Sequence, residues 1–265
     1  MIYREHALPA AACRAAFCAW SFALERHDPE TVVHSIPPDG TGNLLLARAP
    51  DGVLTRRLVG PSLSAQIGPV HRGWRFAGLR LRPECVAAVT GRDPAALVGT
   101  SAPAEGPEPL FAALAGLVEC EERWELDEAG ANLLASHAGD PAVAAAVDLL
   151  VASGGTASIE AAAACVRLSP RQLRRRFAAA TGLSPKQYAC VQRVRRALIL
   201  SLHGGSWAGV AADSGFADQP HLSRAIRAAF HTAPRTIGGY IGGIRHEFVE
   251  PAGGRFVQDG NSERA

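Results

Sequence analysis

Three kinds of sequence pattern are missing from this chain of 265 residues. No apolar run approaches the ~20 residues that a membrane-spanning helix needs. The N-terminus, Met1 to His6, has no basic leader followed by an apolar core, so we expect no secretory signal. G-x-S-x-G, P-loop and dinucleotide-binding motifs do not occur either. These absences predict a cytoplasmic protein with no membrane partner and without the commonest catalytic sites.

Cysteine pairs at metal-binding spacing are also lacking. The six cysteines stand apart and form no C-x-x-C motif: Cys13, Cys18, Cys85, Cys120, Cys165 and Cys190. Disulfides are disfavoured in the cytoplasm, so we expect these side chains to act as small buried hydrophobic residues. A thiol sensor formed by Cys13 and Cys18 is the weaker alternative. We therefore expect no metal and no cofactor.

The net charge of +2 hides an uneven distribution. Residues 1–145 carry 12 arginines and 17 acidic residues, a net charge of −5. Residues 146–250 carry 13 basic and 6 acidic residues, a net charge of +7. A basic segment of this kind is the electrostatic requirement for binding a polyanion such as nucleic acid.

The basic segment contains an internal repeat. Its first copy has seven characteristic positions: Ile159, Ala162, Ala163, Leu168, Leu173, Phe177 and Pro185. The second copy repeats them about 48 residues later: Trp207, Val210, Ala211, Phe216, Leu222, Ile226 and Pro234. Each copy has two short apolar-periodic stretches separated by a turn, which is typical of a helix-turn-helix. Two such units on one chain predict a protein that binds double-stranded DNA.

Capping residues delimit the helices of the first copy. Ser158 is a predicted N-cap, and Ser169 with Pro170 begins the second helix. In that second helix Leu173 and Phe177 face the protein core. The opposite face of the helix therefore carries Arg171, Arg174, Arg175 and Ala178. Arginine can pair with guanine in the major groove, although a charged face can also be simply solvated. The duplication favours groove contact.

A long helix from Pro185 to about His203 connects the copies. Eighteen helical residues span about 27 Å, close to the ~34 Å between successive major-groove openings. The second copy begins its outer helix near Asp218 and has fewer base-reading side chains than the first. We therefore predict that residues 170–180 select the sequence and that residues 219–230 mainly hold the register.

These residues resemble a known family. Residues 169–177, Ser-Pro-Arg-Gln-Leu-Arg-Arg-Arg-Phe, and residues 181–185, Thr-Gly-Leu-Ser-Pro, are similar to the first half of the AraC-type DNA-binding domain. Residues 210–224, from Val-Ala-Ala-Asp-Ser-Gly-Phe to Leu-Ser-Arg, are similar to its second half. The resemblance covers residues 155–245.

Two positions depart from the family pattern. Ile226 stands where the family usually has phenylalanine. His231 occupies the counterpart of Gly182, at a helix end that favours a positive φ angle. We expect the second unit to be less stable or less deeply docked than the first.

The resemblance implies a bacterial transcription regulator of the AraC/XylS type, usually an activator, that binds promoter or operator DNA in the nucleoid. Residues 36–40, 58–61 and 78–83 look like the uncharacterised β-rich sensor domain of one branch of this family. An unknown small-molecule effector, RNA polymerase and a second copy of the chain are the further partners implied.

The N-terminal half shows short strand-like segments with Gly and Pro turns at residues 19–24, 31–36, 44–46, 53–59 and 74–81. Such a pattern predicts a sandwich or barrel. Helical patterns then follow at 83–89, 94–98, 109–123, 128–136 and 141–152, with a linker at 99–109.

The predicted fold class is α+β with two domains, a β-rich, cupin-like N-terminal domain and an all-α double helix-turn-helix domain. The predicted divisions are a sensor or dimerisation domain, a helical connection, the DNA-binding domain and a flexible tail: residues 1–100, 101–153, 154–249 and 250–265.

Candidate site residues follow from these patterns. The predicted base contacts are Arg171, Arg174, Arg175, Gln219, His221 and Arg224. The predicted phosphate contacts are Arg176, Arg193, Arg196 and Arg227. The candidate effector pocket is aromatic: Trp20, Phe22, His34, Trp74 and Phe76. The alternative for each aromatic residue is a place in the core.

Other functions remain as alternatives. A metal- or sugar-dependent enzyme on the N-terminal barrel would need closely spaced histidines, but His34 and His71 stand alone, so we expect no enzyme. A repair protein that methylates its own cysteine would need a four-cysteine zinc site, and only Cys13 and Cys18 lie near the N-terminus. A third alternative makes residues 1–100 a dimerisation module without a ligand.

Overall fold

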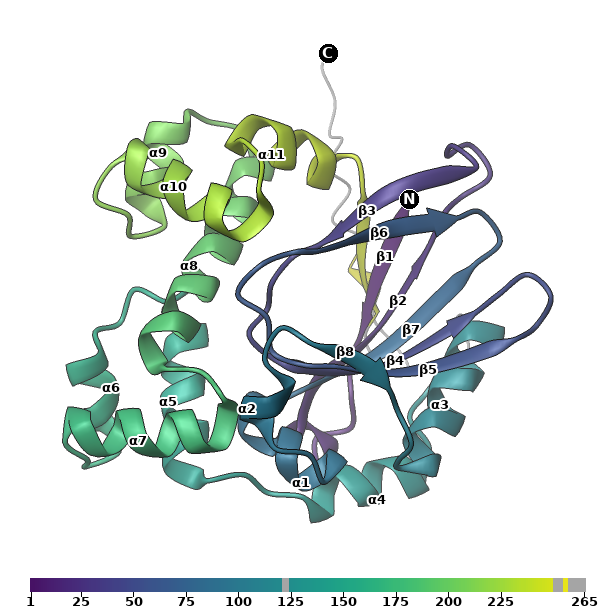
Figure 1. The fold of residues 1–265 in the computed structure, drawn as a ribbon, viewed down its shortest axis with the longest axis horizontal. Helices are drawn as coiled ribbons and strands as arrows, with labels where there is room; N and C mark the ends of the chain where they lie inside the picture. Colours follow the sequence, from purple (N-terminus) through teal and green to yellow (C-terminus); the bar gives the residue numbers. More distant parts are fainter. Residues whose placement is uncertain (121–123, 250–254, 257–265) are drawn as a thin grey trace.

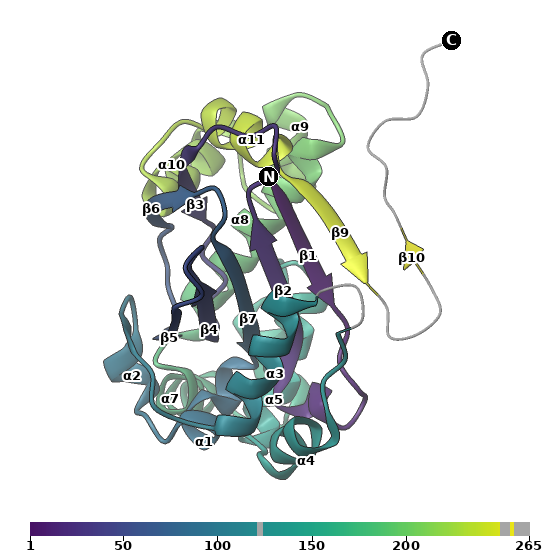
Figure 2. The same cartoon turned by 90° about the vertical axis from the view of Figure 1, so that its right-hand side faces the viewer.

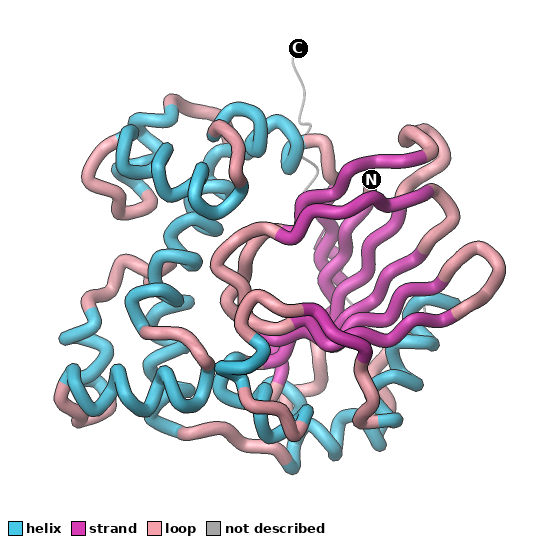
Figure 3. Tube along the Cα trace, viewed as in Figure 1, coloured by secondary structure: helices cyan, strands magenta, loops and turns pink. Residues whose placement is uncertain are grey.

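The computed structural model describes residues 1–120, 124–249 and 255–256. Strands gather on one side of the molecule and most of the helices on the other, as Figures 1 and 3 show. A β-rich N-terminal domain is followed by a helical domain that contains two helix-turn-helix units. The predicted α+β fold class is therefore confirmed.

Within the described residues the larger sheet has eight strands, in the order β10-β9-β1-β2-β7-β4-β5-β8. Its strands are β1 (Ile2–His6), β2 (Ala16–Ala23), β4 (Gly42–Arg48), β5 (Leu54–Val59), β7 (Arg75–Leu81), β8 (Ser101–Pro103), β9 (Arg245–Val249) and β10 (Arg255–Phe256). All neighbouring strands are antiparallel except β1 and β9, which run parallel. The sheet thus joins the first and last described strands of the chain.

One face of this sheet is covered by helices. Alternate residues of β4 and β7, such as Leu46 and Leu79, are almost fully buried against α3 (Glu108–Glu119) and its residue Phe111. The short η1 (Ala12–Arg14) and α4 (Glu128–Ser136) complete the same core. Figure 2 shows α3 lying along the sheet.

The opposite face of the sheet looks toward a small second sheet of two strands, β3 (Thr31–Ile36) and β6 (Gln66–His71). The ring of His34 on β3 stacks on that of Phe22 on β2, with 4.1 Å between ring centroids. Because this contact bridges the two sheets, the β-rich domain has a second, smaller core between them.

Three short elements follow β7 and lead toward the helical domain. They are η2 (Pro83–Cys85), α1 (Val86–Thr90) and α2 (Pro94–Leu97). The carbonyl oxygen of Pro94 lies so close to Gly182 that a Cβ there would approach it to 2.6 Å. Glycine is required at this contact because both the space and the φ angle of +73° exclude a side chain.

The helical domain has two cores that share one helix. Its helices are α5 (Pro141–Ala152), α6 (Ile159–Cys165), α7 (Pro170–Thr181), α8 (Pro185–Leu202), α9 (Trp207–Asp213), α10 (Gln219–Phe230) and α11 (Pro234–Gly242). Tyr188 near the start of α8 is buried in the first core, and Leu198 near its end in the second. The helix therefore runs through both units (Figure 1).

Several sequence predictions agree with these boundaries. The strand at 31–36 and the helices at 128–136 and 141–152 lie where the patterns placed them. Strands β1 and β6 were missed, and β8 lies inside the stretch interpreted as a linker. Because β8 has only three residues and pairs with β5, its sequence carries little signal of its own.

The predicted division of the chain needs revision at two places. The stretch 101–153 is no separate connection, because α3 and α4 pack in the core of the β-rich domain and α5 packs in the first helical core. Strand β9 lies in the predicted DNA-binding domain but pairs with β1. Of the predicted flexible tail, only residues 255–256 lie within the described part of the chain, where they form β10.

In the part of the chain that the structure describes, no single helix is both long and apolar enough to cross a membrane. The helices α4 and α5 reach the required length and apolarity only as a pair, with a bend of 110° between them.

Candidate nucleic-acid interface

The two helix-turn-helix units, α6–α7 and α9–α10, have the same turn. In each unit the second residue after the first helix adopts a left-handed conformation, Arg167 in the first and Gly215 in the second. The next amide closes the turn, from Leu168 to the carbonyl of Ala163 and from Phe216 to the carbonyl of Ala211. The repeat seen in the sequence is therefore a repeat of backbone geometry.

Side-chain caps fix where each second helix begins. Ser169 and Gln172 form a reciprocal capping box at the start of α7, and Pro170 occupies its first turn. Asp218 accepts a hydrogen bond from the His221 amide at the start of α10, with an N–O distance of 2.6 Å. We call α7 and α10 the reading helices. Their N-termini are set by local sequence.

The outer face of α7 carries three exposed arginines, as predicted. Leu173 and Phe177 are fully buried on the other face. Arg171 and Arg175 are exposed, and Arg174 makes one long ion pair of 3.7 Å with the exposed Glu160. An exposed pair of this kind contributes little to stability and can be exchanged for another acceptor.

Arg176 is paired with a neighbouring helix. Its guanidinium donates two hydrogen bonds to the carboxylate of Asp140, at 2.6 and 2.7 Å. Burial raises the pKa of Asp140, but the hydrogen bonds from Arg176 and from two amides of α5 outweigh it and lower the pKa. The predicted phosphate contact is therefore already occupied, and Arg176 fastens α7 to α5.

Two further predicted phosphate contacts also have partners within the protein. Arg193 lies over the ring of Phe216, 5.1 Å from its centroid, and donates to the carbonyl of Gly215. Arg196 donates to the carbonyl of Ser153 at 3.3 Å. On this side α8 packs against the turn of the second unit and against the end of α5.

The reading helix α10 exposes Gln219, Arg224 and Arg227. His221 is half-buried and sets its ring edge-on against Phe216, with 5.2 Å between centroids and 88° between planes. This contact packs His221 against the turn of the second unit. His231 has a φ angle of +55°, so the prediction that it occupies a left-handed helix end is confirmed.

The five aromatic residues of the candidate effector pocket come together between the larger sheet and the small sheet. Phe22 stacks on His34, Trp74 stacks on Phe76, and Trp20 packs against the same cluster. Burial lowers the pKa of His34 to about 4. These contacts fill the small core between the two sheets, which agrees with the alternative interpretation as core residues.

A group of polar residues on the same face was not foreseen. We call Tyr3, Glu5, Asp39, Asn43 and Arg80 the polar cluster. Arg80 donates to the Glu5 carboxylate and to the Tyr3 hydroxyl, both at 2.8 Å, and lies 3.4 Å from Asp39. Burial raises the pKa of Glu5, but Arg80 outweighs it and keeps the pKa low. The sequence did contain one signal for this cluster. Tyr3 and Glu5 are two residues apart along β1, so their side chains lie on the same face of the sheet.

The polar cluster lies next to the helix that joins the two units. Gln192 of α8 donates to the Asp39 carbonyl at 3.3 Å, and the charge of Arg195 lowers the pKa of Glu5. The hydroxyl of Tyr188 is buried nearby and has no hydrogen-bond partner among the described residues. The β-rich domain thus contacts α8 through polar groups.

Contacts between the domains reach both cores of the helical domain. Arg82 of the β-rich domain donates to Asp148 of α5 at 2.6 Å. The hydroxyl of Tyr240 on α11 lies 2.5 Å from Nδ1 of His34 and accepts a hydrogen bond from the Ser35 amide. The β-rich domain is therefore in contact with a helix of each core, α5 in the first and α11 in the second.

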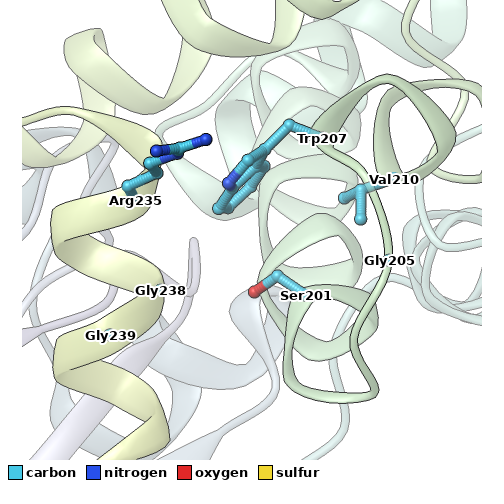
Figure 4. A pocket seen from close by; sticks show the side chains of 7 residues that line it. All are labelled: Ser201, Gly205, Trp207, Val210, Arg235, Gly238 and Gly239. Carbon is cyan, nitrogen blue, oxygen red and sulfur yellow. The ribbon is translucent and has the colours of Figure 1, made fainter.

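Figure 4 shows a shallow pocket of about 300 Å³ between α8, α9 and α11. Trp207 forms one wall, Arg235 and Ser201 border it, and Gly238 and Gly239 leave its floor without side chains. It lies far along the chain from the predicted effector residues and shares none of them.

One group of side chains has the composition of a cation site. Glu25, His27 and Asp28 place ligand atoms within 4.8 Å of one another. The N-terminal ammonium of Met1 pairs with both carboxylates and Arg245 pairs with Glu25, so two positive charges already compensate them.

Two helix-turn-helix units joined by one helix, with an exposed arginine face on the first, define a DNA-binding transcription regulator. Residues 162–238 match the model of a helix-turn-helix domain family. No curated protein matches the chain.

Solved structures include similar chains. A transcriptional regulator from Chromobacterium violaceum, described as containing an AraC-type DNA-binding domain, is 31% identical, with 37% of this chain and 90% of that chain covered and a TM-score of 0.35. The DNA-binding domain of AdpA, a global transcriptional factor in complex with a target DNA, is 27% identical over 38% of this chain and 93% of that one, with a TM-score of 0.35. ToxT from Vibrio cholerae is 11% identical over 84% and 98%, with a TM-score of 0.45.

The family match and the identity to the Chromobacterium protein both indicate a helix-turn-helix DNA-binding domain. The chain belongs to the family of transcription regulators with an AraC-type DNA-binding domain. The predicted resemblance is confirmed.

Proposed function

We propose that the protein is a sequence-specific regulator that places α7 and α10 in successive major grooves of promoter DNA. The exposed face of Arg171, Arg174 and Arg175 on α7 is the observation that carries this proposal. The second helix of a helix-turn-helix enters the major groove, and arginine recognises guanine through its O6 and N7 atoms.

The two reading helices have unequal roles in this proposal. α7 presents three arginines to the bases, whereas α10 presents Gln219 and Arg224. His221 is turned against Phe216 and contributes to the turn instead. Sequence choice therefore depends mainly on α7, and α10 holds the register with Arg227 directed at phosphate.

The connector α8 supports simultaneous binding of both helices. Its 18 residues give a length of about 27 Å, compared with about 34 Å between groove openings on one side of the duplex. Its two ends are buried in different cores, so the spacing between the units is fixed by packing.

Selection of bound sequences from a random DNA pool tests this proposal. The full chain should enrich a site with two conserved segments about one helical turn apart. The variant Arg171→Ala/Arg175→Ala should lose the segment read by α7 and keep the other. A variant that enriches the same two segments as the wild type would contradict the assignment of α7.

We further propose that the β-rich domain senses a small-molecule effector and passes the change to the DNA-binding domain. The support is that the aromatic residues and the polar cluster share one face of the sheet, next to α8 and α11. As an activator, the protein would also contact RNA polymerase. A second copy of the chain, bound as a homodimer partner, would recognise a second DNA site of the same kind.

A metabolite screen with the full chain tests the coupling. The expected result is saturable binding that also changes the affinity for the selected DNA. Binding that leaves DNA affinity unchanged would contradict the coupling. The enzyme alternative receives no support from the histidines, since His34 faces Tyr240 and His71 lies 2.9 Å from the hydroxyl of Thr31.

A further inference from the structure

Two residues other than glycine have a positive φ angle in the described part of the chain, Arg167 at +54° and His231 at +55°. Each occupies one of two left-handed positions that the repeat creates. In the first unit these positions are Arg167 and Gly182, and in the second they are Gly215 and His231. Each copy therefore replaces a different glycine by a basic residue.

The turn at Arg167 has the geometry that glycine adopts with least strain. The Arg167 amide donates to the carbonyl of Ala164 at 3.1 Å, and the Gly215 amide donates to Ala212 at the same distance. Side chains are strained in this conformation because Cβ approaches the following carbonyl group. The first unit carries this strain, whereas the second avoids it with Gly215. Strain of this kind at a retained side chain points to a functional role.

The position of the Arg167 side chain suggests what that role is. It is exposed and makes no ion pair or hydrogen bond within the described residues. The acidic residue of the preceding helix, Glu160, pairs with Arg174 instead. Arg167 stands two residues before the N-cap Ser169, at the end of α7 that enters the groove. DNA phosphates flank the N-terminus of a reading helix when its first residues reach the bases.

We propose that Arg167 is a phosphate-contact residue that clamps the N-terminus of α7 to the DNA backbone. A guanidinium group binds phosphate with two parallel hydrogen bonds, and the positive end of the helix dipole at the N-terminus of α7 favours the same negative charge. This inference rests on the proposed docking of α7 in the major groove. It adds a contact that positions α7 without reading a base.

The second unit cannot hold an equivalent contact. A Cβ atom at Gly215 would approach Cγ2 of Thr156 to 2.6 Å, so the turn has no room for a side chain. The clamp therefore belongs to the first unit alone, in agreement with the greater role of α7 in choosing the sequence.

The variant Arg167→Gly separates strain from function, because the two effects have opposite signs. Its melting temperature should equal or exceed that of the wild type, since glycine relieves the left-handed strain. Its DNA affinity should fall about eightfold at 0.1 M salt, and the slope of log K against log salt should become shallower by about 0.9, the effect of one lost phosphate contact. The preferred sequence should not change. Arg167→Lys should keep most of the slope.

His231→Gly is the matched control, because it relieves the same strain at the far end of α10. It should leave affinity and salt slope unchanged. If the wild type enriches no DNA sequence, the proposed function itself fails. If the wild type binds its selected site and Arg167→Gly binds it equally well with the same slope, the clamp is refuted while the proposed function stands. A fall in melting temperature for Arg167→Gly would also refute the clamp, because it would mean that the Arg167 side chain stabilises the fold.

Discussion

Arginine side chains of the helical domain fall into two groups according to their acceptors. Arg171, Arg175 and Arg224 are exposed and have no partner among the residues that the structure describes. Arg176 and Arg193 are held by a carboxylate and by a ring and a carbonyl. Only the first group can exchange water for a base edge without first breaking an intramolecular contact.

Replacement of Arg175 tests the base contacts. Arg175→Ala should relax the preference at one base pair at a cost of about 1–3 kcal/mol, because a bidentate contact to guanine is lost. Competition binding between the selected site and its single-base variants measures this. Arg176→Ala is a useful comparison, since it should lower stability through Asp140 and leave the base preference unchanged.

His34 predicts a pH dependence of folding. Its pKa is about 4 in the folded protein, compared with about 6.5 for an unperturbed histidine. Between these values the unfolded chain binds more protons, so stability is complete above pH 6.5 and falls as the pH drops toward 4. A protonated Nδ1 could no longer accept the hydrogen bond from Tyr240.

Urea denaturation at several pH values, with His34→Gln as the reference, measures this effect. The difference in stability between wild type and variant should shrink as the pH falls from 6.5 to 4. A difference that stays constant over this interval would mean that His34 does not titrate as its burial indicates.

At the scale of elements, the two ends of the reading helix α7 are set by capping residues that act on their sequence neighbours. Ser169 and Gln172 satisfy amides at its N-terminus, and Gly182 ends it in a left-handed conformation. The same capping box recurs at Ser184 and Gln187 of α8. Such signals depend on neighbours within four residues, which explains why these helices could be predicted from the sequence.

Removal of the α7 cap should destabilise the domain. Ser169→Ala should lower the free energy of unfolding by about 0.5–2 kcal/mol, because an amide at the helix N-terminus loses its acceptor. Ser169→Thr retains a hydroxyl and should lose less. Chemical denaturation of both variants measures the difference; equal stability of Ser169→Ala and wild type would show that water replaces the cap.

For the whole molecule, charge is concentrated on the DNA-binding half. Residues 146–250 have a net charge of +7, and the remaining part is net negative. Affinity for the selected site should therefore fall steeply with salt, because each neutralised phosphate contributes about −0.9 to the log–log slope. Binding titrations between roughly 50 mM and 300 mM salt measure this slope, because release of condensed counterions dominates the salt dependence there. A flat plot would contradict phosphate contacts by this domain.

The sequence alone determined the two helix-turn-helix units, since their caps, first-turn prolines and apolar periodicity act over a few residues. It also indicated the arginine face of α7 and the left-handed conformation of His231. Local rules of this kind do not depend on where the rest of the chain lies.

Only the tertiary structure decided which parts belong together. Strand β9 pairs with β1 across more than 240 residues, and α3 and α4 complete the core of the β-rich domain. The capture of Arg176 by Asp140 and the contact of His34 with Tyr240 likewise join residues far apart in sequence. The physical reason is that a partner brought close only by folding leaves no signal in the neighbouring sequence. Two arginines with similar neighbours along the chain can therefore differ, one being exposed to solvent and the other bound to a protein group.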